Sequence, residues 1–123
     1  MLYKHYTGYT GPWPYENFGK HEVSCKHCGE FYLDRNAMSK LQQLRDLWGQ
    51  PLVINSGHRC VVHNRNVGGS PTSQHLKIAF DCHMPKTKQE EFITLAKRVG
   101  FTGIGIYNNF VHLDTGPSRT WKG

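Results

Sequence analysis

Apolar side chains recur at helical spacing in two stretches of the chain. The first stretch follows Asp34 and Asn36, either of which can cap a helix, and it stops at Gly49. The second follows Thr87 with Glu90 three residues later, a capping box, and it also stops at a glycine. The apolar positions are Met38, Leu41, Leu44, Leu47 and Trp48 in the first stretch and Phe92, Leu95, Ala96 and Val99 in the second. We therefore predict two helices, each with one face in the core.

Short apolar runs predict strands on either side of the second helix. Asn108-Asn109 separates the last two runs and is a natural turn pair, so these runs form a hairpin. The stretch 58–74 contains Gly68-Gly69 and Pro71 and indicates a loop. The expected strands are 51–55, 78–83, 103–107 and 110–114. This order of elements predicts an α+β fold, a small and largely antiparallel sheet with two flanking helices.

The length of 123 residues is that of one domain. Residues 1–20 show neither helical nor strand periodicity, and we expect an irregular N-terminal arm. Its aromatic side chains would either pin it to the rest of the chain or form a surface that stacks on sugars. Residues 21–123 are expected to form a single domain. No apolar run approaches the roughly 18 residues of a membrane span, and the first residues lack the apolar block of a secretory signal.

Basic residues outnumber acidic ones, with 15 Lys and Arg against 9 Asp and Glu and a formal charge of +6. Such a surface favours polyanions, which include nucleic acid, anionic lipid and a bacterial wall rich in phosphate and carboxylate. The basic residues form no stripe typical of a DNA-reading helix, and we expect no nucleic-acid partner. The eight histidines indicate function more strongly than the net charge does, because imidazole is the commonest metal ligand and proton shuttle near neutral pH.

The four cysteines are Cys25, Cys28, Cys60 and Cys82. Without an export signal, disulfides are not the default expectation. Cys25 and Cys28 form a single Cys-x-x-Cys pair without a second pair nearby, whereas a closed zinc site needs four ligands. Two interpretations stay open: a structural zinc or redox role, and buried or incidental thiols.

Three polar residues, His75, Asp81 and His112, occupy places where strands should run through a core. Side chains alternate along a strand, so Asp81 and His112 converge if their two strands are neighbours. Two imidazoles and one carboxylate leave a fourth metal position open, which distinguishes catalytic zinc from structural zinc. The alternative is that each residue is singly hydrogen-bonded near the surface.

A series of motifs extends over roughly residues 21–121. They are Ser73-Gln74-His75 with Ala79-Phe80-Asp81, Phe110 to Asp114, Ile54 to Arg59, Asn64 to Ser73, Gly105-Ile106-Tyr107, and Asp114-Thr115-Gly116 through Arg119 and Trp121. In this order they resemble the zinc D-Ala-D-Ala carboxypeptidase family and its related peptidoglycan endopeptidases. The match is closest to the small phage endolysin type. The resemblance implies a fold like that of the D-Ala-D-Ala peptidases and hedgehog domains.

The resemblance also implies roles for single residues. His75, Asp81 and His112 would be the ligands of a catalytic Zn²⁺. Arg59 would hold a substrate carboxylate, for which its planar fork suits it, with a surface ion pair as the alternative. Ser73 would bond near the metal or the substrate backbone, or only form a turn.

Two departures from the family pattern matter. Only Leu76-Lys77-Ile78 separate His75 from Ala79, one residue fewer than in relatives, and the missing residue is a glycine. We expect this tighter turn to displace His75 from ideal zinc geometry, or His83 to replace it as a ligand. In addition, many relatives place an acidic base where this chain has Asn109, and an amide cannot accept the proton. Asp114 would then be the base, or it would support a ligand imidazole.

We therefore expect a zinc metallopeptidase that hydrolyses peptidoglycan stem peptides at a bond involving D-alanine, and we expect it to be a monomer. Without a signal peptide, the protein would reside in the cytoplasm of the producing or infected bacterium. It would act at the wall as a phage lysis or virion protein. One alternative is a wall-peptide-binding or structural module on the same fold that has lost catalysis. A weaker alternative is a nucleic-acid-binding protein that uses the Cys-x-x-Cys pair and the positive charge.

Overall fold

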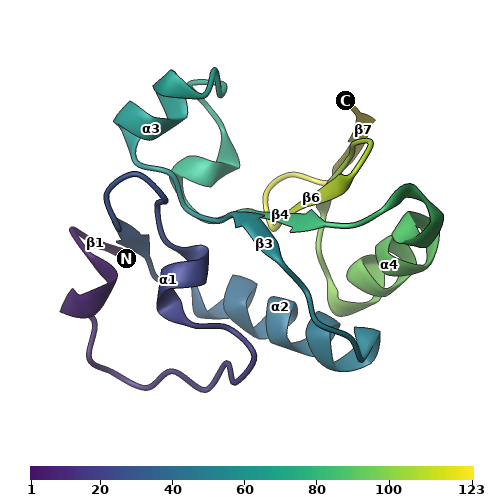
Figure 1. Cartoon of the computed structure of the whole chain (residues 1–123), viewed down its shortest axis with the longest axis horizontal. Coiled ribbons are helices and arrows are strands. Elements are labelled where there is room, and N and C mark those ends of the chain that lie inside the picture. The colour runs from purple at the N-terminus through teal and green to yellow at the C-terminus, as the bar shows by residue number, and fades with distance from the viewer.

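Five strands form the central sheet of the computed structural model, which describes all residues 1–123 (Figure 1). Its strand order is β3 (Ile54–Ser56), β4 (Phe80–His83), β6 (Phe110–Asp114), β5 (Gly103–Ile106) and β7 (Arg119–Lys122). Neighbouring strands are antiparallel except for β5 and β7, which are parallel. The predicted α+β class with a largely antiparallel sheet is confirmed. The sheet is larger than predicted, because β7 was not expected as a strand.

Both predicted helices are present, as α2 (Arg35–Trp48) and α4 (Lys86–Val99). The Asp34 side chain caps α2 by accepting a hydrogen bond from the Ala37 N–H at 3.0 Å. Gly49 ends that helix with a φ of 70°. The predicted capping box of α4 is wrong, because Pro85 is the N-cap and Thr87 lies inside the helix.

Strand alternation separates a core face of the sheet from a polar face. The core face belongs to one buried cluster that also contains apolar side chains of α2 and α4, and Trp48 of α2 packs edge-to-face on Phe92 of α4. The strand residues in this cluster are Ile54, Phe80, Cys82, Ile104, Val111 and Leu113. Alternation directs Asp81 and His112 to the other face of the sheet. The helices α2 and α4 therefore cover one face of the sheet, and Asp81 and His112 lie on the opposite face.

The stretch 58–74, expected to be a loop, contains the short helix α3 (Val61–Asn66). Figure 1 shows α3 above the sheet, with α2 beneath it. The helix has six residues, and its apolar side chains Val61 and Val62 are exposed. It lacks the apolar stripe by which a helix is recognised in sequence, so the pattern did not indicate it. A 3-10 turn, η2 (Gln74–Leu76), then leads toward β4.

The first twenty residues are mostly without regular structure, but they are packed. A two-residue strand β1 (Leu2–Tyr3) pairs with β2 (Phe31–Tyr32), and a 3-10 turn η1 (Tyr6–Gly8) and helix α1 (Lys20–Val23) flank an irregular segment. Within that segment, Tyr9, Tyr15 and Phe18 are buried in the common core. None of the helices combines the length and the apolarity needed to cross a membrane.

A close backbone contact ties α1 to the end of β3. The His58 N–H donates to the Val23 carbonyl at 2.9 Å, and a Cβ on Gly57 would collide with that carbonyl. We expect Gly57→Ala to lower the free energy of unfolding by about 1–3 kcal/mol through overpacking. Gly8→Ala, where a Cβ meets nothing within 4 Å, should change it by less than about 1 kcal/mol. Urea unfolding measures the change in each variant. Equal changes in Gly57→Ala and Gly8→Ala would contradict the close contact of Gly57 with the Val23 carbonyl.

Candidate active site

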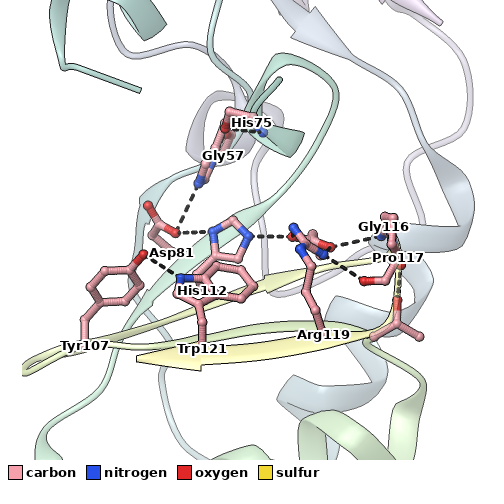
Figure 2. Close-up of polar contacts among 12 residues, drawn as sticks. Gly57, His75, Asp81, Tyr107, His112, Gly116, Pro117, Arg119 and Trp121 are labelled. Carbon is pink, nitrogen blue, oxygen red and sulfur yellow. Dashed lines mark hydrogen bonds and ion pairs between the residues drawn. The ribbon is translucent and has the colours of Figure 1, made fainter. Parts of the chain in front are cut away.

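Two neighbouring strands and the turn before them bring His75, Asp81 and His112 together. The β4–β6 register places Asp81 directly opposite His112, and η2 carries His75 over them. The possible ligand atoms of the three side chains all lie within 4.8 Å of one another. Figure 2 shows both imidazoles directed at the Asp81 carboxylate. The three residues selected from the sequence therefore form one buried group.

The outer nitrogen of each imidazole is held by an acceptor. His75 Nδ1 donates to the Gly57 carbonyl at 2.6 Å, and His112 Nε2 donates to Asp114 Oδ2, also at 2.6 Å. The inner nitrogens, His75 Nε2 and His112 Nδ1, lie 3.1 and 3.0 Å from Asp81 Oδ1. Fixing one nitrogen as a donor leaves a lone pair on the other, as metal-binding histidines require. The group thus offers two imidazole lone pairs and one carboxylate, which fits Zn²⁺ with an open position.

The charges of the group stabilise one another. Burial alone would raise the pKa of Asp81, but the adjoining imidazoles of His112 and His75 outweigh it and hold that pKa well below its usual range. Burial alone would lower the pKa of His112, yet its bonds to Asp114 and Asp81 raise that pKa above its ordinary value. Asp81 is therefore a carboxylate at neutral pH, the form that binds a metal.

Asp114 is fully buried, and its oxygens are already engaged. Arg119 donates to both of them, to Oδ2 at 2.9 Å and to Oδ1 at 3.0 Å, and the Gly116 N–H donates to Oδ1 at 2.9 Å. On the adjacent strand, Gly103 makes room for this carboxylate, because a Cβ there would collide with Oδ1. These contacts favour the supporting role of Asp114 over the role of general base.

The shortened turn between His75 and Ala79 closes without a left-handed residue. Lys77 adopts φ −109° and ψ −102°, and no residue other than glycine has a positive φ. The buried His58 braces this turn, since its Nδ1 lies 2.5 Å from the Lys77 carbonyl and its Nε2 lies 2.8 Å from Glu30 Oε1. His75 lies with Asp81 and His112, its Nε2 3.1 Å from Asp81 Oδ1, and the displacement from ideal zinc geometry stays a prediction. His83 is exposed and lies outside the group.

A cleft of about 720 Å³ opens above the three residues. Arg59 lines it, with its guanidinium 3.0 Å from Asn64 Oδ1 and 3.6 Å from Asp81 Oδ2. Ser73 also lines it, although its hydroxyl accepts the His75 N–H at 3.1 Å, the contact of a turn-forming residue. The remaining wall includes the aromatic residues Tyr107, Phe110 and Trp121. Asp81 is the only carboxylate that lines the cleft.

Sequence reasoning missed two residues that support the group. His58 gave no signal beyond its place in the turn before Arg59, and its contact with the Lys77 carbonyl joins positions 19 apart. Arg119 was noticed only as part of a closing motif, although it holds the Asp114 carboxylate. Asn109 lies exposed in the β5–β6 connection, outside the cleft lining.

Comparison with known proteins places the chain in a family. A family model described as Peptidase M15 matches residues 16–114. The chain is 32% identical over 99 residues to peptidoglycan L,D-endopeptidase MepK of Escherichia coli K12, covering 72% of this chain and 54% of that protein. It is 33% identical over 92 residues to the zinc D-Ala-D-Ala carboxypeptidase of Streptomyces albus G, covering 69% of this chain and 36% of that protein.

The chain thus spans about half, or less, of the curated relatives that it matches. The family model extends from before α1 to the last residue of β6 and includes all three residues of the buried group. The resemblance inferred from the motifs is confirmed. The chain belongs to the Peptidase M15 family.

Proposed function

We propose that this protein is a zinc-dependent peptidase that hydrolyses peptide bonds in peptidoglycan. One observation carries the proposal: two imidazoles and a carboxylate converge at the base of an open cleft, and fixed acceptors hold their outer nitrogens. The relatives' names, one a peptidoglycan endopeptidase and one a zinc carboxypeptidase, support the substrate and the metal. We assign catalysis to residues 21–123, with residues 1–20 as an arm packed on that domain.

His75, Asp81 and His112 would hold the Zn²⁺, which would polarise the scissile carbonyl and acidify a water. Asp114 would orient His112 and keep a proton on its Nε2, so that Nδ1 stays available as a ligand. Arg59, at the cleft wall, would bind a carboxylate of the substrate peptide through its planar fork. The hydroxyl of Ser73 would fix the turn that carries His75.

The finer assignment concerns the bond and the setting. We propose cleavage of stem peptides at a bond involving D-alanine, by a phage-type protein that acts at the cell wall. The formal charge of +6 supports this setting, because a basic protein is attracted to an anionic wall over long range. That attraction should weaken as salt is added, since exposed charges are screened.

The direct test is digestion of purified peptidoglycan, with the released fragments identified by mass spectrometry. The expected result is cleavage at one kind of peptide bond, lost on chelation and restored by zinc. The masses of the fragments distinguish a carboxypeptidase, which releases a terminal amino acid, from an endopeptidase, which separates two peptides. Cleavage that persists after complete removal of metal would contradict the proposal.

Arg59→Lys replaces a bidentate fork with a point charge and should weaken substrate binding. We expect kcat/KM to fall on the order of 10-fold or more, because a charge-assisted hydrogen bond contributes about 1.5–3 kcal/mol. Zinc content and the unfolding transition should stay unchanged. The matched control is Arg65→Lys, at an exposed position of α3 outside the cleft lining. Equal kinetics for both variants would place Arg59 outside the substrate site.

A second candidate function is peptide binding without turnover. The observation behind it is that Asp81 is the only carboxylate lining the cleft, while Asp114 is buried against Arg119. A protein without a free base would retain wall peptides and zinc but release no fragments. Co-sedimentation with purified wall, measured beside the digestion assay, separates this function from hydrolysis.

A further inference from the structure

Three cysteines gather outside the lining of the cleft. Cys25 and Cys28 lie in the turn after α1, and Cys60 lies directly before α3, yet their sulfur atoms are all within 4.8 Å of one another. In Figure 1, the turn between α1 and β2 reaches up to the start of α3. None of the three lines the cleft. This group is therefore separate from the candidate active site.

The backbone around these cysteines is shaped to present their sulfurs. Gly29, with a φ of 79°, follows Cys28 and lets the chain turn back, and its N–H donates to the Cys25 carbonyl at 2.8 Å. The Cys60 N–H lies 3.4 Å from Cys25 Sγ, and the His63 N–H lies 3.3 Å from Cys60 Sγ. Donors directed at sulfur stabilise thiolates, the form in which cysteine binds a metal.

Two histidines adjoin the three sulfurs. His27 Nδ1 lies 3.8 Å from Cys60 Sγ, and the rings of His27 and His63 are stacked at 5.9 Å with nearly parallel planes. Cys60 and His63 repeat the two-residue spacing of Cys25 and Cys28, so each segment supplies a closely spaced pair. Three thiolates and one imidazole are a donor set of closed, tetrahedral zinc sites.

A disulfide accounts for these residues less well than a metal does. All four cysteines of the chain are free, and a disulfide within a group of three would leave one thiol without a partner. One tetrahedral ion uses all three sulfurs at once, because zinc–sulfur distances of about 2.3 Å place the sulfurs of such a site within the separations found here.

We propose that Cys25, Cys28 and Cys60 bind a structural zinc ion, with His27 or His63 as the fourth ligand. On binding, each coordinating thiol releases its proton to solvent, and no redox step is involved. The ion would fasten the turn after α1 to the segment that begins with Gly57, His58 and Arg59. That segment supplies the acceptor of His75 and the cation of the cleft. The site would therefore hold the candidate active site in place without taking part in catalysis.

The test is metal analysis of the purified protein beside five variants. Cys28→Ser changes an exposed residue and should lose one zinc per chain while keeping the metal at His75, Asp81 and His112. His112→Ala should show the reverse loss. Cys82→Ala, which alters the one cysteine outside the group, should keep all metal. His27→Ala and His63→Ala identify the fourth ligand as the variant that loses this zinc.

Two measurements keep the test informative if Cys28→Ser fails to fold. The unaltered protein, with its zinc replaced by cobalt, should show thiolate-to-cobalt charge-transfer absorption, which the His75 site cannot produce. A mercurial reagent that blocks thiols should release that metal alone. A disulfide found by intact mass, or full zinc retention in Cys28→Ser, would overturn the proposal. Neither result bears on the peptidase, whose metal is followed separately through His112→Ala.

Discussion

His112→Ala is expected to abolish both zinc binding at the candidate active site and peptidoglycan cleavage. His112 Nδ1 lies 3.0 Å from Asp81 Oδ1, and its Nε2 donates to Asp114, which Arg119 holds in turn. Two remaining ligands cannot complete the three-residue set of a catalytic zinc site. The measurements are zinc content by elemental mass spectrometry and fragment release from purified wall.

The matched control for this variant is His83→Ala. His83 lies on the same strand as Asp81 and on the same face by alternation, but its side chain is exposed and outside the buried group. It should keep both zinc and activity. If His83→Ala loses the metal and His112→Ala retains it, the ligand assignment is wrong.

Asp114→Asn separates a supporting carboxylate from a general base. As a support, Asp114 accepts a hydrogen bond from the Nε2–H of His112. Loss of the carboxylate should lower zinc affinity about 10–100-fold. At saturating zinc, much of kcat should then return, because no group that exchanges protons with the substrate is missing. A general base would behave differently, since kcat would stay low at full zinc occupancy. Zinc titration combined with kinetics at saturating metal distinguishes the two.

The same variant should change how stability depends on pH in the metal-free protein. Burial would raise the pKa of Asp114, but His112, Arg119 and the Gly116 N–H outweigh it and hold that pKa well below its usual range. A lowered pKa stabilises the fold above the unfolded value of about 4, and this stabilisation is lost as the pH falls below it. Urea unfolding between neutral and acidic pH should show a smaller acid-induced loss in Asp114→Asn. An equal dependence of the unfolding free energy on pH in the variant and the unaltered protein would contradict the pairing of Asp114 with His112 and Arg119.

Local patterns in the sequence were sufficient for the two helices and for the face of its own strand on which Asp81 or His112 lies. That the two side chains meet depends on the pairing of β4 with β6, which joins positions 31 apart and which the sequence left as a condition. The contribution of His75 depends on the path of the turn before β4, which brings its Nε2 to 3.1 Å from Asp81 Oδ1. His58 holds that turn from a distant segment.

The parts that escaped sequence reasoning depend on contacts between distant segments. Cys25 and Cys28 look like an isolated pair until the fold brings Cys60 to them across 35 positions. The burial of Asp114 depends on Gly103 opposite it and on Arg119 from β7, a strand that was not expected. No pattern within one element contains these contacts, so its roles as base and as support could not be separated beforehand.

The most direct measurement is anomalous diffraction at the zinc absorption edge from crystals grown with zinc. The account predicts an anomalous peak from a zinc ion coordinated by His75 Nε2, the Asp81 carboxylate and His112 Nδ1 at about 2.0–2.2 Å. His112 Nε2 should remain on Asp114. A zinc-loaded crystal without a peak between these three residues, or with the metal on His112 Nε2, would contradict it.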